Sequence, residues 1–202
     1  MTKAEFAARL KHACASVLAA EDELTEIDSR FGDADHGLTM AKIAGAISTA
    51  VDQAEGGIQA MLDDAAMAVM TLNGGSAVPL WNTWLDGMQE EAPEGNEIDV
   101  PGLQAIFARA LETLDDMSGA KVGDKTMMDA LIPASRAIIS FQGSDEAALF
   151  AAAAQAAAQG AEDSKRFVSK FGRAKSYGEK TIGTPDAGAV SMSYFFQGLA
   201  RA

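Results

Sequence analysis

A dense group of acidic side chains separates two alanine-rich helical segments near the start of the chain. The stretch Asp28-Ser29-Arg30-Phe31-Gly32-Asp33-Ala34-Asp35-His36-Gly37-Leu38-Thr39 contains three carboxylates, one histidine and two glycines. Carboxylates at this spacing repel one another unless a cation lies among them. Because carboxylates offer only oxygen ligands, a hard cation is favoured, and Mg²⁺ is the first candidate.

The residues that follow the carboxylates could bind phosphate. Gly37 to Thr39 begin a helix, so their N–H groups have no partner within the helix and point back toward the carboxylates. Free N–H groups at a helix start are a ready binding site for phosphate. The two features together indicate a Mg²⁺–nucleotide phosphate site at a helix–loop–helix junction.

Two other interpretations apply to the same stretch. An acidic loop is usually a solvated turn with one capping aspartate, and this stretch alone leaves that alternative open. A calcium-binding EF-hand loop fails on spacing. If Asp33 is position one, the glycine falls at position five instead of six, and Ala44 stands where a glutamate is required.

Composition and charge restrict the class of protein. With 202 residues, of which 48% are hydrophobic and 22% charged, the chain suits a single domain covering residues 1–202. The formal net charge of -13 argues against nucleic acid and anionic membranes as partners, although metal ions can still recruit a nucleotide. We find neither a signal peptide nor a membrane-spanning run, and the single Cys14 lies on an apolar stripe. A cytoplasmic protein is expected.

Helical periodicity accounts for most of the chain. Alanine dominates, β-branched residues are sparse, and no segment alternates with period two. We expect an all-α fold in which eight helices form an antiparallel up-and-down barrel or bundle. Pro133 should kink the sixth helix or divide it. The expected helices cover residues 3–21, 37–54, 58–72, 78–89, 101–117, 125–141, 146–171 and 189–202.

The order of the helices predicts where the connecting loops meet. In an up-and-down bundle every second connection lies at the same end. Four such connections are the acidic loop, Asn73 to Ser76, Ser118 to Asp124, and Gly172 to Gly188. A glycine helix stop explains each loop alone. Together they predict one shared mouth, with the nucleotide site at that end of the barrel.

Three motifs in these loops resemble a known family. They are Gly32-Asp33-Ala34-Asp35-His36-Gly37, Gly123-Asp124-Lys125-Thr126-Met127, and a series formed by Gly172-Arg173-Ala174, Gly178-Glu179, Ile182-Gly183 and Asp186-Ala187-Gly188-Ala189. In this order, over almost the full chain, they resemble the nucleotide-binding L subunit (DhaL type) of dihydroxyacetone kinase. The resemblance implies an eight-helix antiparallel barrel that binds Mg–ADP at one end.

The resemblance also implies roles for individual residues. Asp28, Asp33 and Asp35 would hold two Mg²⁺ ions that bridge the nucleotide phosphates. Arg173 would add a bidentate phosphate contact and, with the three aspartates, complete the catalytic group. Gly119 and Met127 would line the base and ribose of ADP or ATP. The full set of expected nucleotide contacts is His36, Gly37, Leu38, Thr39, Gly75, Ser76, Ala77, Gly119, Met127, Arg173, Asp186 and Gly188.

One loop departs from the family pattern. The family has Ala-Ser-Gly-Pro-Leu and then another glycine, whereas this chain has Ser76-Ala77-Val78-Pro79-Leu80 followed by Asn82. Val78 cannot adopt backbone angles that only glycine tolerates. The departure puts the phosphate contact at this loop in question and points to a divergent partner or substrate.

The resemblance implies one subunit of an enzyme. In the family, a histidine of a separate K subunit holds the ketose covalently, and nothing in this chain resembles that subunit. The expected function is phosphoryl transfer from Mg–nucleotide to dihydroxyacetone, or a related small ketose, on a K-type subunit. Two donors stay open: ATP, or a phosphotransferase-system protein that rephosphorylates bound ADP. A non-catalytic Mg–nucleotide-binding module and a homodimer are further alternatives.

Overall fold

The computed structural model describes residues 1–201 and contains nine α-helices and two 3₁₀ segments. Apart from an isolated bridge between Thr2 and Glu97, the described residues include no β-structure, which confirms the all-α prediction. The elements are α1 (Lys3–Ala19), α2 (Glu21–Ser29), α3 (His36–Gln53), α4 (Ile58–Met70), α5 (Ala77–Glu90), α6 (Val100–Ser118), α7 (Met128–Ile139), α8 (Glu146–Asp163), η1 (Ser164–Arg166), η2 (Arg173–Thr181) and α9 (Ala187–Leu199).

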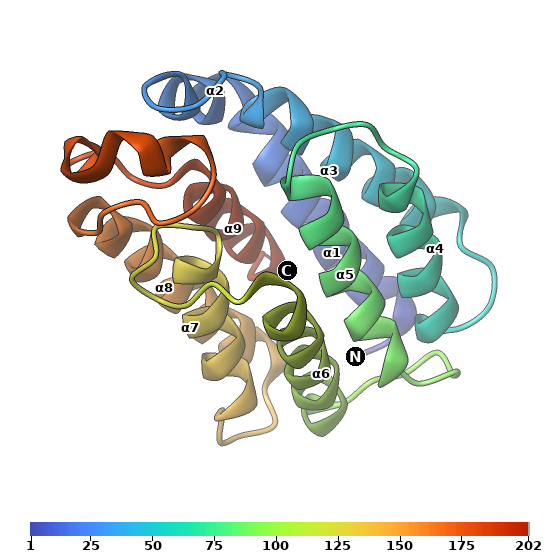
Figure 1. Ribbon diagram of the computed structural model, residues 1–202. Coiled ribbons are helices and arrows are strands. Elements are labelled where there is room, and N and C mark those ends of the chain that lie inside the picture. Colours follow the sequence, from blue (N-terminus) through green and yellow to red (C-terminus); the bar gives the residue numbers. More distant parts are fainter. Residues whose placement is uncertain (202) are drawn as a thin grey trace.

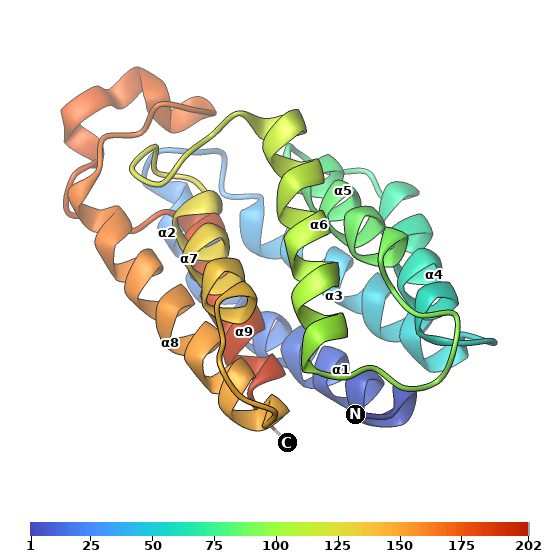
Figure 2. The same cartoon turned by 90° about the horizontal axis from the view of Figure 1, so that it is seen from below.

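Eight long helices form a closed ring, shown from two sides in Figures 1 and 2. Each helix from α3 to α8 packs against the next one, while α1 packs against both α3 and α9 and so closes the ring. The short helix α2 was not predicted. It follows α1 after Ala20 alone, packs on α3 and α9, and lies at the same end as η2 (Figure 1). The order of the long helices is therefore the predicted one.

Aromatic side chains fill the centre of the ring. The rings of Trp81 and Trp84 on α5 lie 5.0 and 5.6 Å from that of Phe195 on α9, and Phe107 and Phe196 join the same cluster. All five side chains are at most 1% exposed. Burial of aromatic side chains is a large stabilising contribution, so this cluster holds α5, α6 and α9 together.

Within residues 1–201, no helix has both the length and the apolarity to span a membrane.

Helices α7 and α8 approach each other closely at a glycine. A Cβ atom on Gly160 of α8 would lie 2.0 Å from the carbonyl oxygen of Asp129 on α7. Pro133 has no N–H to donate to that carbonyl, so the oxygen faces α8. Helix α7 nevertheless runs through Pro133 as one element, and the division that the sequence offered as one alternative does not occur.

Two predicted helix ends were wrong, and buried contacts explain both. The helix expected from residue 125 begins at Met128, because Lys125 has a φ of 60° and the Asp129 carboxylate accepts the N–H groups of Gly123 and Thr126. The helix expected to reach residue 171 ends at Asp163. The next carbonyl, that of Ser164, accepts a hydrogen bond from the Lys125 ammonium. Tertiary contacts of this kind override local helix propensity.

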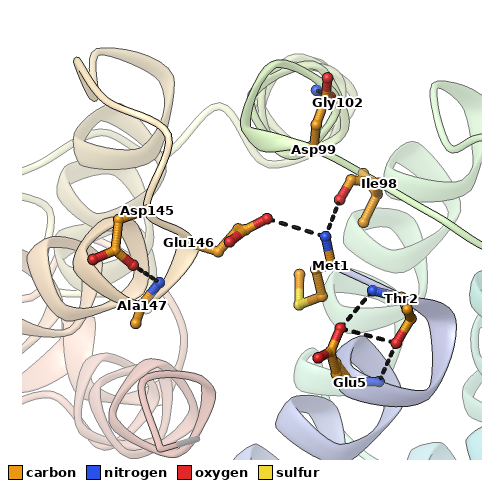
Figure 3. A network of polar contacts seen from close by, with 9 residues as sticks. All are labelled: Met1, Thr2, Glu5, Ile98, Asp99, Gly102, Asp145, Glu146 and Ala147. Carbon is orange, nitrogen blue, oxygen red and sulfur yellow. Dashed lines mark hydrogen bonds and ion pairs between the residues drawn. The ribbon is translucent and has the colours of Figure 1, made fainter.

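The first residues of the chain form a network of polar contacts (Figure 3) at the end of the ring opposite η2 (Figure 1). The Met1 ammonium donates to the Ile98 carbonyl at 2.9 Å and pairs with the Glu146 carboxylate at 3.0 Å. Thr2 and Glu5 form a capping box at the start of α1. Because Ile98 precedes α6 and Glu146 begins α8, these contacts join the starts of three helices.

We predict that Gly160→Ala destabilises the fold, although alanine is the better helix former by about 1 kcal/mol. The added methyl group would collide with the Asp129 carbonyl, and overpacking of this kind costs about 1–3 kcal/mol. Gly45→Ala is the matched control, because Gly45 also lies inside a helix and has nothing within 4 Å of its Cβ position. Urea denaturation should show a loss of stability for the first variant and a small gain for the second. Equal gains would contradict the close approach.

Candidate functional site

A cavity of about 550 Å³ opens at the end of the ring where the four predicted loops meet. Its wall takes residues from the acidic loop, the start of α5, the α6–α7 connection and the segment between α8 and α9. This volume is in the range of small-molecule sites. The prediction that alternate connections share one mouth is therefore confirmed.

Three carboxylates form a cluster at one side of the cavity. Oxygen atoms of Asp28, Asp33 and Asp35 all lie within 4.8 Å of one another. The Asp35 N–H donates to Asp28 Oδ2 at 3.2 Å, and a Cβ atom on Gly32 would lie 2.0 Å from Asp28 Oδ1. Ala34 has a φ of 60°, a conformation that costs free energy for a residue with a side chain. The short α2–α3 junction thus forces the carboxylates together.

The donor set of this cluster fits a divalent hard cation. Each of the three side chains contributes carboxylate oxygen within reach of a single ion, which is the ligand chemistry that Mg²⁺ selects. Among the described residues, Asp28 and Asp35 form no ion pair, and the one cationic side chain paired with the cluster is Arg173, at Asp33. These residues could hold the metal that the sequence predicted.

Arg173 reaches the same cluster from the opposite lip of the cavity. Its guanidinium lies 2.7 Å from Asp33 Oδ2, and its side chain is 71% exposed. On the same 3₁₀ segment, Tyr177 packs against Phe31 of the acidic loop with ring centroids 5.2 Å apart. The sequence placed Arg173 in the site but predicted neither of these contacts. Together they connect η2 to the acidic loop across the mouth.

Four helices, α3, α5, α7 and α9, begin at the cavity wall. Helix α3 starts at His36 and α5 starts at Ala77, after Gly75 and Ser76, and neither start has a side-chain cap. The first N–H groups of a helix lack intrahelical partners, and the helix dipole adds positive potential there. Both starts are therefore suited to bind phosphate oxygens.

The departure from the family pattern at α5 causes no backbone strain. Val78 is the second residue of this helix, does not have a positive φ, and is 7% exposed beside Gly74. Asn82 donates to the Ala66 carbonyl at 2.9 Å and so joins α5 to α4. Glycine-only angles are not needed at Val78, and the N–H groups of this helix start stay at the cavity wall.

Most of the predicted site residues line the cavity. They are Asp28, Asp33, Asp35, His36, Thr39, Gly75, Ser76, Ala77, Met127, Arg173, Asp186 and Gly188. Among residues 1–201, the predicted residues outside the lining are Gly37, Leu38 and Gly119. Gly37 packs on α2, where a Cβ atom would lie 2.1 Å from the Glu21 carbonyl oxygen. Leu38 is 51% exposed, and Gly119 ends α6 in the left-handed conformation.

The opposite wall contains further residues that the predicted set of nucleotide contacts did not include. Lys125, Thr126, Phe171 and Thr184 also line the cavity. Lys125 is 4% exposed, and its ammonium donates to two backbone carbonyls. The Gly-Asp-Lys-Thr motif marked this loop, but nothing in the motif shows that its lysine turns inward.

Burial sets the protonation of two further groups in the wall. Burial raises the pKa of Asp186 to about 7, with a further rise from the nearby Asp129 charge, while Lys125 opposes the shift. Burial lowers the pKa of His36, although the acidic cluster opposes this. The neutral imidazole lies with Nε2 3.3 Å from Ser191 Oγ. At neutral pH His36 therefore adds no positive charge to the site.

Comparison with known proteins defines the family. Residues 30–201 match the DAK2 domain, and the chain belongs to the DAK2 domain family. The resemblance inferred from the three sequence motifs is thereby confirmed.

Among its relatives, the chain is 34% identical to L-erythrulose kinase of Pectobacterium atrosepticum, over 96% of this chain, and 35% identical to D-erythrulose kinase of Mycolicibacterium smegmatis, over 94%. It spans about a third of the length of these two relatives, 34% in each case. It is 29% identical to the ADP-binding subunit DhaL of the PEP-dependent dihydroxyacetone kinase of Escherichia coli, over 94% of this chain and 92% of that protein.

A solved structure shares the fold. The dihydroxyacetone kinase from C. freundii in complex with AMP-PNP and Mg²⁺ superimposes with a TM-score of 0.73 at 24% identity, over 98% of this chain and 33% of that one. This likeness supports the closed ring of helices.

We predict that Asp35→Asn removes Mg-dependent ADP binding, because the loss of one carboxylate removes a ligand and a charge that no neighbour replaces. Asp33→Asn should do the same. Asp63→Asn, on an exposed face of α4, removes the same charge away from the cavity and is the control. Titration calorimetry with ADP and Mg²⁺ decides the matter. Unchanged affinity in both cluster variants would refute the metal assignment.

Asp186 should make the stability of the fold depend on pH. Its folded pKa of about 7 lies above the ordinary value of 3.8, so the folded protein retains this proton at higher pH than the unfolded chain does. The stabilising contribution is therefore present below about pH 4 and is lost as pH rises to about 7. Asp186→Asn keeps an oxygen to accept the Ala189 N–H but cannot ionise.

Without nucleotide and with a chelator, the Tm of Asp186→Asn should rise relative to wild type between pH 5 and pH 8. Asp145→Asn, at the exposed N-cap of α8, is the control and should show no such trend. A constant difference in Tm across this range for Asp186→Asn would contradict the raised pKa.

Proposed function

We propose that this chain is the Mg–nucleotide-binding part of a kinase for a small ketose and acts with a K-type subunit that holds the ketose. The observation that carries the proposal is the cavity wall, where three carboxylates, an arginine and two uncapped helix starts come together. Phosphoryl transfer requires positioned positive charge and N–H donors, and requires no covalent contribution from the protein.

Each group in the wall has a proposed role. Asp28, Asp33 and Asp35 would hold Mg²⁺, two ions by the family resemblance, and bound Mg²⁺ would neutralise charge on the phosphates of ADP or ATP. The first N–H groups of α3 and α5 would bind phosphate oxygens. The contacts proposed beyond the phosphates are Gly119 and Met127 at the base and ribose, and Asp186 and Gly188 at the closing wall.

Arg173 would exchange one partner for another when nucleotide binds. It pairs with Asp33, and this carboxylate is also a proposed metal ligand. When a cation binds Asp33, the Arg173 guanidinium is free to contact the phosphates. It can donate two hydrogen bonds to a phosphate group in a bidentate manner. The side chain is exposed on a 3₁₀ segment and therefore has room to move.

The names of the relatives guide the choice of acceptor and donor. Full-length likeness to an ADP-binding subunit of a PEP-dependent dihydroxyacetone kinase supports dihydroxyacetone as acceptor and a phosphotransferase-system protein that rephosphorylates bound ADP. A second candidate is phosphorylation of erythrulose by ATP. The higher identity to erythrulose kinases, 34% and 35% against 29%, favours it.

The surface around the mouth fits a docking partner. In a chain of net charge -13, the segment between α8 and α9 is basic, and it exposes Phe171, Tyr177 and Ile182 by 41 to 50%. A patch that combines apolar area with positive charge steers an acidic partner. The basic residues of this segment are Lys165, Arg166, Lys170, Arg173, Lys175 and Lys180.

We predict that Arg173→Ala lowers the rate of phosphoryl transfer by about 10- to 150-fold, the equivalent of one charge-assisted contact of about 1.5–3 kcal/mol. The Tm should change little, because the Asp33 pair is exposed and such pairs contribute little to stability. Arg109→Ala, which removes an arginine of α6 paired with Glu90 and Glu112 outside the cavity lining, is the matched control. An unfolded Arg173→Ala protein with normal activity per folded molecule would assign Arg173 to the fold instead.

The proposal as a whole is tested with purified components. The chain with Mg²⁺, ATP and dihydroxyacetone or erythrulose should show no turnover alone. Turnover should appear when a K-type subunit is added, with ATP or with a phosphotransferase-system donor. Robust turnover by the chain alone would show that the ketose site lies here, and no turnover or nucleotide binding under any of these conditions would refute the kinase proposal.

A further inference from the structure

The Lys125 ammonium lies where three segments of the cavity wall meet. Its Nζ atom donates to the Ser164 carbonyl at 2.6 Å and to the Thr184 carbonyl at 2.5 Å. Ser164 directly follows α8, Thr184 precedes α9, and Lys125 itself belongs to the α6–α7 connection. The two contacts join residues that are 39 and 59 positions apart in the sequence. One buried side chain therefore connects three segments of the cavity wall that lie outside the α-helices.

The backbone around Lys125 is arranged to turn this side chain inward. Lys125 has a φ of 60°, a conformation that lysine rarely adopts. On either side of it, the N–H groups of Gly123 and Thr126 donate to the Asp129 carboxylate at 2.6 and 2.7 Å. Asp129 is 0% exposed. A buried carboxylate therefore maintains the strained turn that points the ammonium into the wall.

Ser164 extends the constraint to the start of α9. Its hydroxyl accepts the N–H of Asp186 at 2.9 Å and donates to the Ala161 carbonyl at 2.6 Å. Asp186 in turn accepts the Ala189 N–H at 2.8 Å and caps α9. The position of Asp186, which lines the cavity, thus depends on the residue that Lys125 holds.

A buried ammonium is costly unless it is hydrogen-bonded, and Lys125 is only 4% exposed. An apolar side chain of equal length would fill the same space without this cost, but it could not bind two carbonyl oxygens. We infer that Lys125 is a positioning residue, whose ammonium fixes the α6–α7 connection and the segment before α9 at the separation that the nucleotide requires. The identity of that ligand rests on the proposed function.

Three variants test this role. Lys125→Met keeps the length of the side chain and removes the charge and the donors, whereas Lys125→Arg keeps both. Lys121→Met is the matched control, because Lys121 lies in the same connection but is exposed and pairs with Asp115 at 2.5 Å. For each variant, calorimetry measures the affinity for Mg–ADP, and hydrogen exchange without nucleotide measures the protection of amides in residues 184–190.

We expect Lys125→Met to bind Mg–ADP at least tenfold more weakly and to exchange faster in residues 184–190, with exchange in α1 to α5 unchanged. Lys125→Arg should recover part of the affinity, and Lys121→Met should equal wild type in both measurements. Wild-type affinity and protection in Lys125→Met would overturn the inference. So would a loss of protection spread evenly over all helices, because that pattern belongs to a residue that supports only the fold.

The two proposals fail in different ways. If wild type does not bind Mg–ADP, the proposed function fails, whereas the exchange comparison still decides whether Lys125 holds residues 184–190. If Lys125→Met does not fold, Ser164→Ala takes its place, because it removes the hydroxyl that accepts the Asp186 N–H and keeps the carbonyl that Lys125 holds. Weaker Mg–ADP binding with faster exchange at residues 186–190 then supports the inference, and wild-type values contradict it.

Discussion

Repulsion among three aspartates is the constraint on which the site end of this protein depends. Their carboxylate oxygens lie within 4.8 Å of one another, and the exposed Arg173 offers the group one ion pair. The chain holds them there through a tight junction, in which Gly32 and the Asp35 N–H contact Asp28 and Gly37 packs on α2. Like charges held this close favour a bound cation. The arrangement that makes the three carboxylates repel one another without metal is therefore the arrangement that would bind metal.

In the closed ring of helices, the contacts that stabilise the fold lie in the middle and at one end, and the candidate site lies at the other end. The aromatic cluster around Trp84 fills the middle, and the contacts of Met1 with Ile98 and Glu146 secure the far end. The end with the cavity is formed by loops. These loops bring together candidate metal ligands, helix N-termini and cationic side chains from distant parts of the sequence. Irregular segments at this end are not loose, because buried polar groups such as Lys125 and Asp129 hold their backbone in place.

Local sequence patterns predicted the eight long helices, because alanine-rich amphipathic segments separated by glycines have few alternatives. They predicted the shared mouth because alternate connections of an up-and-down bundle lie at one end. The acidic cluster followed from the spacing of Asp28, Asp33 and Asp35. What the patterns could not show was set by tertiary contacts. The start of α7 and the end of α8 depend on Lys125, whose positive φ and inward direction no motif specifies. The sequence put the phosphate contact near Val78 in question, but the backbone of Val78 is helical and needs no angles that only glycine tolerates.

We propose that the acidic cluster binds a divalent cation together with a nucleotide. Crystals grown with ADP and Mn²⁺, an anomalous scatterer that accepts the same oxygen ligands as Mg²⁺, test it most directly. We expect anomalous peaks in contact with Asp28, Asp33 and Asp35, and ADP phosphates at the starts of α3 and α5. Mn²⁺ bound elsewhere, or ADP bound in the cavity with no anomalous peak among these three carboxylates, would contradict it.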